Sequence, residues 1–237
     1  MPIHDWRRVI AGTFHHFHQM WITEISNALN GGLLPTGYYA MAEQVAGGPH
    51  PEACENHGGS NDVITSIADH PPRLRYTLEA EEAIYAAKAD RIAVYHASGD
   101  RAVAFLEIIS PGNKHSEVAV IQVIERLSRA LARGCHLTMI DLFPPGRHDP
   151  QGIHAEIWGK PDPLVAPEEP LLLAAYRAAV SPVASLEPMA VGCSLVDMPL
   201  FLANERYINL PLEKTYLAAW NGMPERWKQV IEPATTA

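Results

Sequence analysis

A carboxylate stands inside an almost unbroken apolar run. Residues 102–109 read AVAFLEII, and Glu107 is the charged residue among them. The β-branched and aromatic side chains predict a strand that is buried on both faces. A charge in such a strand is costly unless it is paired, protonated or bound to a metal. Glu107 is therefore either part of a site or half of a buried ion pair with Lys114 or an arginine.

The residues beyond this strand add a second chemical group. The run ends at Ser110-Pro111-Gly112, and Asn113 and Lys114 follow directly. A buried acid near the carboxyl end of a strand, with a lysine just beyond it, is a common way to build a site on an α/β scaffold. A lysine in that place could orient water or stabilise negative charge that develops on a phosphoryl oxygen.

Two more acids lie in or at the ends of predicted strands. Glu43 belongs to the run YYAMAEQV, and Asp62 opens the run DVITSI. Neighbouring strands could bring Glu43, Asp62 and Glu107 together. Three convergent carboxylates repel one another unless a cation lies between them, and Mg²⁺ or Mn²⁺ is the cation that oxygen ligands favour. The usual structural use of Asp62 is as an ordinary turn or strand-start residue.

The elements that would position these groups follow from periodicity. Apolar residues at helical spacing predict helices at 14–30 and 116–133, the second with Ser116 as its N-cap. The four-residue turn 97–100 predicts an antiparallel hairpin between strands 91–96 and 102–109. The buried run 136–143 should pair in parallel with 102–109 through the second helix. Asp141, inside that run, is either a secondary site residue or a structural partner.

The composition changes after residue 143. Thirteen of the twenty prolines lie beyond that point. We therefore divide the chain into an α/β core, 1–143, and a proline-rich extension, 144–237, packed on the core. The fold class predicted is a single α/β domain with a mixed sheet flanked by helices.

Charge and hydropathy exclude several functions. The formal net charge is −9 in 237 residues, which argues against a general affinity for nucleic acid but leaves room for a local basic groove. No apolar stretch reaches the length of a membrane span, and the N-terminal residues lack the apolar core of a signal peptide. Three widely spaced cysteines form no disulfide framework, so we expect a reduced, cytoplasmic protein. The sequence does not indicate the oligomeric state.

Five segments carry a resemblance to a known family. They are MPIHDW, GYYAMAEQ, LEIISPGNK, HLTMIDLF and DMPLFL. Together they resemble the DUF4058 family of bacterial proteins, over most of the chain, and that family has no established activity. Its core is in turn similar to the Uma2-like branch of the PD-(D/E)XK nuclease superfamily. The resemblance implies a restriction-endonuclease-like core with a metal-dependent phosphodiesterase site and a nucleic-acid partner.

The resemblance also implies roles for individual residues. Asp62 takes the place of the first aspartate of the motif, after Asn61 where proline is usual. Glu107 takes the place of the second acid. Ile109 stands at the lysine position, so Lys114 would be a displaced catalytic lysine. With Glu43 as an additional acid, the implied metal ligands are Glu43, Asp62 and Glu107, and the implied catalytic residues are Asp62, Glu107 and Lys114.

Other classes of function stay open. The same fold could serve as a non-catalytic binding module in which the acids form structural ion pairs. Ser110 could be the nucleophile of another hydrolase, although no G-x-S-x-G motif surrounds it and capping a turn suits it better. His15 and His18 are spaced to share a metal, but a third ligand is not marked by spacing, which favours polar helix surface.

Overall fold

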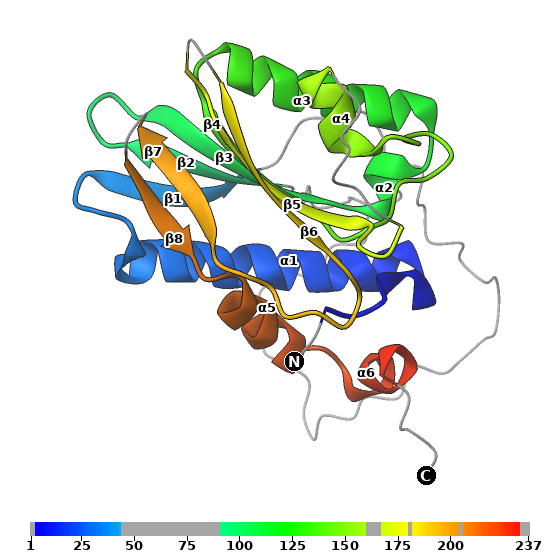
Figure 1. Cartoon of the computed structure of the whole chain (residues 1–237). Coiled ribbons are helices and arrows are strands. Elements are labelled where there is room, and N and C mark those ends of the chain that lie inside the picture. Colours follow the sequence, from blue (N-terminus) through cyan, green and yellow to red (C-terminus); the bar gives the residue numbers. More distant parts are fainter. Residues whose placement is uncertain (1–2, 44–90, 160–166, 180–181, 204–205, 233–237) are drawn as a thin grey trace, which may run out of the picture. The chain divides into compact units, whose positions relative to one another are not determined.

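A mixed sheet is the centre of the computed structural model, which describes residues 3–43, 91–159, 167–179, 182–203 and 206–232. Six strands lie side by side in the order of the chain (Figure 1). Strands β3 and β4 are parallel, and every other neighbouring pair in this sheet is antiparallel. The strands are β1 (Tyr38–Glu43), β2 (Arg91–His96), β3 (Arg101–Ile109), β4 (His136–Asp141), β5 (Leu171–Arg177) and β6 (Val183–Met189).

The predicted hairpin is confirmed by β2 and β3. Its turn passes through two residues with positive φ, Gly99 at 84° and Asp100 at 47°, a conformation that glycine and aspartate tolerate better than most residues. The register places Arg91 opposite Glu107. Because directly paired residues point to the same face, the first residue of β2 and the buried acid of β3 share one side of the sheet.

The predicted β–α–β unit is confirmed as well. Helix α3 (Glu117–Ala132) connects β3 to its parallel neighbour β4, and the Ser116 side chain accepts a hydrogen bond from the Ala119 amide at its start. The segment between β3 and α3, predicted as a turn, instead contains a one-turn helix, α2 (Pro111–Lys114). Proline at its first position suits a helix start, where the missing N–H would have no partner.

Helices cover both faces of the sheet (Figure 1). One face packs against α1 (Ala11–Ala28), against the two-stranded hairpin of β7 (Met198–Ala203) and β8 (Arg206–Leu210), and against α5 (Leu212–Asn221). The other face packs against α3 and α4 (Gly152–Trp158). Alternate residues of β3 enter the two cores, with Leu106 and Ile108 on the α1 side and Ile109 on the α3 side. The short elements are a 3₁₀ turn at Trp6–Arg8, a π turn at Leu29–Leu33, and α6 (Glu225–Ile231).

The predicted α/β class with a mixed, helix-flanked sheet is confirmed. The boundary expected at residue 143 falls inside the sheet, because β5 and β6 pair with β4 and with each other. The helix predicted at 14–30 begins and ends slightly earlier, as α1, and continues into the π turn. The strand predicted to begin at Asp62 lies outside the described residues.

Candidate functional site

The first predicted metal ligand, Glu43, is part of an ion pair. It stands opposite Arg91 in the β1–β2 register, and its Oε2 accepts hydrogen bonds from Arg91 Nη2 at 2.9 Å and Nε at 3.2 Å. The Tyr95 hydroxyl donates to its other oxygen. Both sides of the ion pair are about a fifth exposed. The β1–β2 pairing therefore supplies Glu43 with a guanidinium and a phenol.

The second predicted ligand, Glu107, is 2% exposed and is bonded to Arg126. Arg126 comes from α3, the helix that covers the face to which Glu107 points. Across the strands, the neighbour of Glu107 is Arg91, whose guanidinium lies 4.1 Å from the ring centre of Phe105. The arginine ion pair that the sequence left open for Glu107 is thus confirmed.

The described donors do not fit a Mg²⁺ or Mn²⁺ ion. Arg91 separates Glu43 from Glu107 along the register, and two strand spacings put their Cα atoms about 9–10 Å apart. Each acid already has a cation beside it. Within the described residues, no three His, Cys, Asp or Glu side chains are grouped to hold a metal. Asp62, the third predicted ligand, lies outside them, so its role stays a prediction.

Lys114, the predicted catalytic lysine, binds a different pair of acids. Its Nζ lies 2.7 Å from Asp141 Oδ2 and 3.0 Å from Asp149 Oδ2. It also donates to the backbone carbonyls of Phe143 at 2.7 Å and Pro144 at 3.3 Å. An ammonium has three N–H donors, so four oxygens saturate it. Lys114 therefore pairs with acids other than Glu107, because the turn of α2 carries it to the end of β4, and its catalytic role stays a prediction.

The three charged side chains around Lys114 form a buried triad. Exposure is 8% for Lys114, 7% for Asp141 and 0% for Asp149. Burial raises the pKa of Asp141, and the Lys114 ammonium opposes that rise. The second oxygen of each acid is also used: Asp141 accepts from the Phe143 amide at 3.1 Å, and Asp149 accepts from the Gly146 amide at 2.8 Å. We call Lys114, Asp141 and Asp149 the buried triad.

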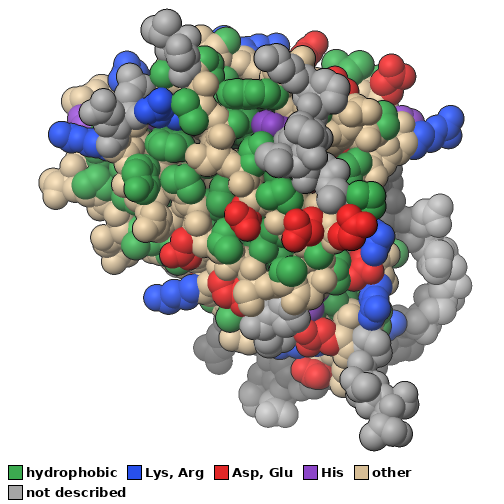
Figure 2. Space-filling view, viewed as in Figure 1, with side chains coloured by type: hydrophobic (Ala, Val, Ile, Leu, Met, Phe, Trp, Pro, Cys, Tyr) green, Lys and Arg blue, Asp and Glu red, His purple; other side chains and the backbone are tan. Residues whose placement is uncertain are grey.

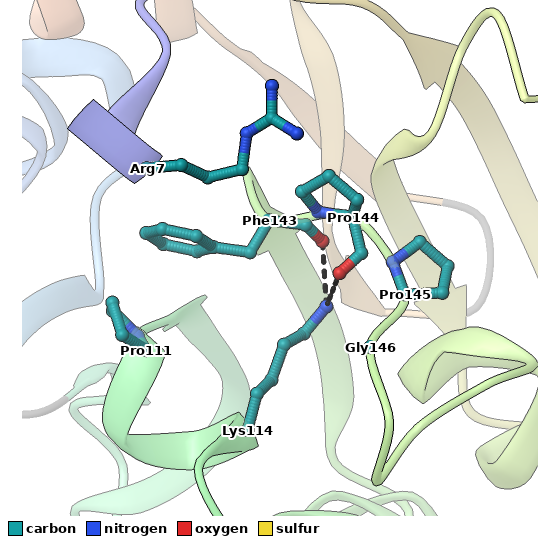
Figure 3. Close-up of a pocket in the computed structure, with 7 residues that line it drawn as sticks. All are labelled: Arg7, Pro111, Lys114, Phe143, Pro144, Pro145 and Gly146. Atoms are coloured by element: carbon teal, nitrogen blue, oxygen red, sulfur yellow. Dashed lines mark hydrogen bonds between the residues drawn. The ribbon is translucent and has the colours of Figure 1, made fainter.

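A pocket of about 340 Å³ lies beside the buried triad, beyond the carboxyl ends of β3 and β4 (Figure 3). Carboxyl ends of parallel strands are where open α/β sheets place their ligands. Apolar rings from Phe143 and prolines form much of its wall. The lining residues are Arg7, Pro111, Lys114, Phe143, Pro144, Pro145 and Gly146.

Arg7 is the exposed cation of this pocket. It comes from the N-terminal segment, and its Nε and Nη2 donate to the two Asp5 carboxylate oxygens at 2.8 Å and 3.1 Å. Its side chain is 62% exposed, so this ion pair is weak and salt-sensitive. Asp5 occupies the Nε and Nη2 edge of the guanidinium, which leaves Nη1 as the edge that a ligand would meet. Sequence reasoning missed Arg7, since nothing in MPIHDWRRVI marks it as part of a site.

The other residues considered for catalysis have structural partners. The Ser110 hydroxyl and amide both bond to the Asn113 side-chain oxygen, at 3.1 Å and 2.9 Å, as expected of a residue that caps a turn. His15 and His18 lie on α1 with ring centroids 6.1 Å apart. His18 is buried, which lowers its pKa to about 3 and keeps it neutral. The polar helix surface predicted for this pair is wrong for His18, which is 3% exposed and whose ring stacks on Phe14.

Comparisons with protein-family models, with curated proteins and with solved structures gave no match. The family resemblance therefore stays a prediction. In the part of the chain that the structure describes, no helix combines the length and the apolar character that crossing a bilayer requires.

Proposed function

We propose that the protein is a binding module whose pocket beyond β3 and β4 takes a small ligand with an apolar body and one acidic group. The pocket carries the proposal. It combines the Phe143 ring and prolines with the side chain of Arg7, and it occupies the edge of an α/β sheet where ligands bind. Its volume of about 340 Å³ suits a single ring with a short substituent.

The charges around the pocket favour one acidic group on the ligand. The ammonium of Lys114 is neutralised by Asp141 and Asp149, so it offers little attraction to an incoming anion. Arg7 is the cation left to meet a ligand, and a guanidinium binds a carboxylate through parallel hydrogen bonds. A carboxylate on the ligand would bind at the Nη1 edge that Asp5 does not occupy.

The phosphodiesterase hypothesis has less support from the described geometry. Glu43 and Glu107 each have an arginine partner, and Lys114 is saturated at a different place. On the face drawn in Figure 2, Asp and Glu side chains gather across the middle and lower parts, and the described Lys and Arg side chains lie mainly toward the margins. This distribution suits a small ligand better than a nucleic-acid backbone. The hypothesis now depends on Asp62.

Amide NMR with two matched fragments tests the proposal. Benzoate and benzamide have the same ring, and only benzoate carries a charge. We expect benzoate to shift the amide signals of Phe143 and Gly146 at millimolar concentration and to bind more tightly than benzamide. Arg7→Met should remove that preference, since it removes the guanidinium and keeps much of the stem.

The control is Arg133→Met, which removes an exposed arginine at the end of α3. It should leave the preference for benzoate unchanged. No shift at the pocket with either fragment would contradict the proposal. So would Mg²⁺-dependent cleavage of DNA or RNA by the wild type that Glu107→Ala abolishes, because that result would assign the acids to catalysis.

A further inference from the structure

The N-terminal residues pack onto the body through the buried side chains of Ile3 and Trp6 and through a few specific hydrogen bonds. The Ile3 amide donates to the Cys193 carbonyl at 2.6 Å, and the Ile3 carbonyl accepts from the Gly192 amide at 2.9 Å. Arg8 Nη1 donates to the Ile231 carbonyl at 3.1 Å. Residues 3–8, which we call the strap, therefore contact the loop after β6 and the end of α6. The strap also carries Arg7 to the pocket.

The Tyr216 hydroxyl is the centre of the contacts that hold the strap. It lies 3.2 Å from Trp6 Nε1, 3.2 Å from the His4 amide nitrogen and 2.6 Å from His4 Nδ1. The first two groups can only donate, so they take both lone pairs of the phenol oxygen. The phenol hydrogen must then go to His4 Nδ1, which accepts it. His4 Nε2 carries the ring proton and donates to Glu232 Oε1 at 2.7 Å.

This arrangement requires a neutral imidazole. A proton on Nδ1 would make His4 a third donor to the Tyr216 oxygen, and the phenol hydrogen would lose its acceptor. His4 is 4% exposed, and its ring stacks on Trp220 with centroids 3.6 Å apart. Packing therefore restricts any reorientation of the His4 ring while the strap is closed.

We propose that the strap is a proton-controlled gate: neutral His4 holds it closed with Arg7 at the pocket, and protonated His4 releases it. The consequence for binding rests on the proposed function of the pocket. Binding that uses Arg7 requires the closed strap, so an acid shift that opens the strap weakens binding, and a bound ligand opposes opening by the same factor.

The charged surroundings of His4 set the pH range. Burial lowers the pKa of His4 most strongly. Glu232, through its hydrogen bond and charge, and Glu213 of α5 act in the opposite direction. The net effect is a lowered pKa of His4 in the closed strap. When the strap opens, the pKa of His4 returns to about 6.5, so the closed state loses stability as the pH falls below that value.

The indole N–H signals of Trp6 and Trp21 provide the test, in the protein without ligand. Trp6 donates to Tyr216 within the strap contacts, whereas Trp21 donates to Thr215 Oγ1 at 3.0 Å and its ring packs on Tyr216 from α1. Between pH 7.5 and 5, the Trp6 signal should shift and the Trp21 signal should stay. His4→Gln, which cannot titrate, should keep the Trp6 signal constant over this range.

A second variant protects the test against a folding failure of His4→Gln. Glu232→Gln weakens the hydrogen bond that holds neutral His4 and lowers the pKa of the closed-state imidazole, so opening becomes easier and the Trp6 transition should move to higher pH. An unchanged transition in either variant would overturn the gate, and so would a wild-type Trp6 signal that does not shift while the fold is intact.

Benzoate affinity at pH 7.5 and 5.5 then tests the link to the pocket. Failure of benzoate to bind at all would overturn the pocket function and leave the ligand-free result valid.

Discussion

Lys114 and Asp141 form a buried ion pair that joins the turn after β3 to the end of β4. Their Nζ–Oδ2 distance is 2.7 Å, and neither side chain is more than a tenth exposed. The pair lies beside the pocket, so the groups that stabilise this edge of the sheet also shape the wall that a ligand meets. The lysine to which the family resemblance assigns catalysis has four oxygen partners at this edge of the sheet.

Removing the Lys114 ammonium should destabilise the fold. Lys114→Met leaves Asp141 and Asp149 buried without their cation, and breaking a buried pair from one side costs about 3–5 kcal/mol of the free energy of unfolding. Urea denaturation at pH 7 measures this loss of free energy of unfolding. Lys214→Met, at an exposed position of α5, is the control and should change stability by less than about 0.5 kcal/mol. Equal midpoints for the two variants would mean that the buried triad contributes no stability.

The Glu107–Arg126 ion pair should show a measurable coupling energy. A double-mutant cycle with Glu107→Gln and Arg126→Met should give about 0.5–3 kcal/mol, as for side chains in direct contact. The matched control is Glu125–Arg129, an i,i+4 pair on the same helix at 3.9 Å with both side chains more than 60% exposed. Its coupling should be about 0.3–0.5 kcal/mol. A Glu107–Arg126 coupling no larger than that of the control would contradict the assigned role.

Acid should destabilise the protein through His18. Its pKa is lowered to about 3 by burial and by His15, whereas the unfolded chain restores the ordinary value. Below pH 6.5 the unfolded state takes up a proton that the folded state refuses, so stability falls as the pH falls. From pH 7 to pH 5 this group alone should remove about 2 kcal/mol of the free energy of unfolding.

Urea denaturation at the two pH values compares the wild type with His18→Phe. The variant keeps an aromatic ring beside Phe14 and cannot titrate. Between pH 7 and pH 5, the variant should lose less free energy of unfolding than the wild type, by about the same 2 kcal/mol. The buried histidine His136 has its pKa lowered as well, so part of the acid effect should persist. Identical losses in both proteins would show that folding does not lower the pKa of His18.

Local patterns in the sequence were enough to predict much of the fold. Alternation and turn residues define the β2–β3 hairpin, and apolar spacing with Ser116 defines α3. The parallel pairing of β3 and β4 then follows from the connection between them. The place of β5 and β6 in the same sheet was not predicted, because proline-rich connections conceal the strands and pairing between distant segments leaves no local pattern.

The candidate site was harder to predict, because the partner of a buried charge depends on packing. The sequence correctly marked Glu107 and Asp141 as buried acids that need a partner. It did not determine which cation each would receive, since Arg126 reaches Glu107 from a separate helix. Asp149 has no signature in its loop, and Arg7 joins the pocket from the far N-terminal end of the chain.

Paramagnetic broadening by Mn²⁺ tests most directly whether Glu107 and Lys114 stabilise the fold or serve a metal. In an amide NMR titration, a bound Mn²⁺ broadens the signals of residues around its site. We expect no selective broadening around Glu107, because Arg126 and Arg91 surround it with positive charge. Selective broadening of the Arg91 and Glu107 amides that disappears in Asp62→Ala would contradict the account and restore the metal-dependent site.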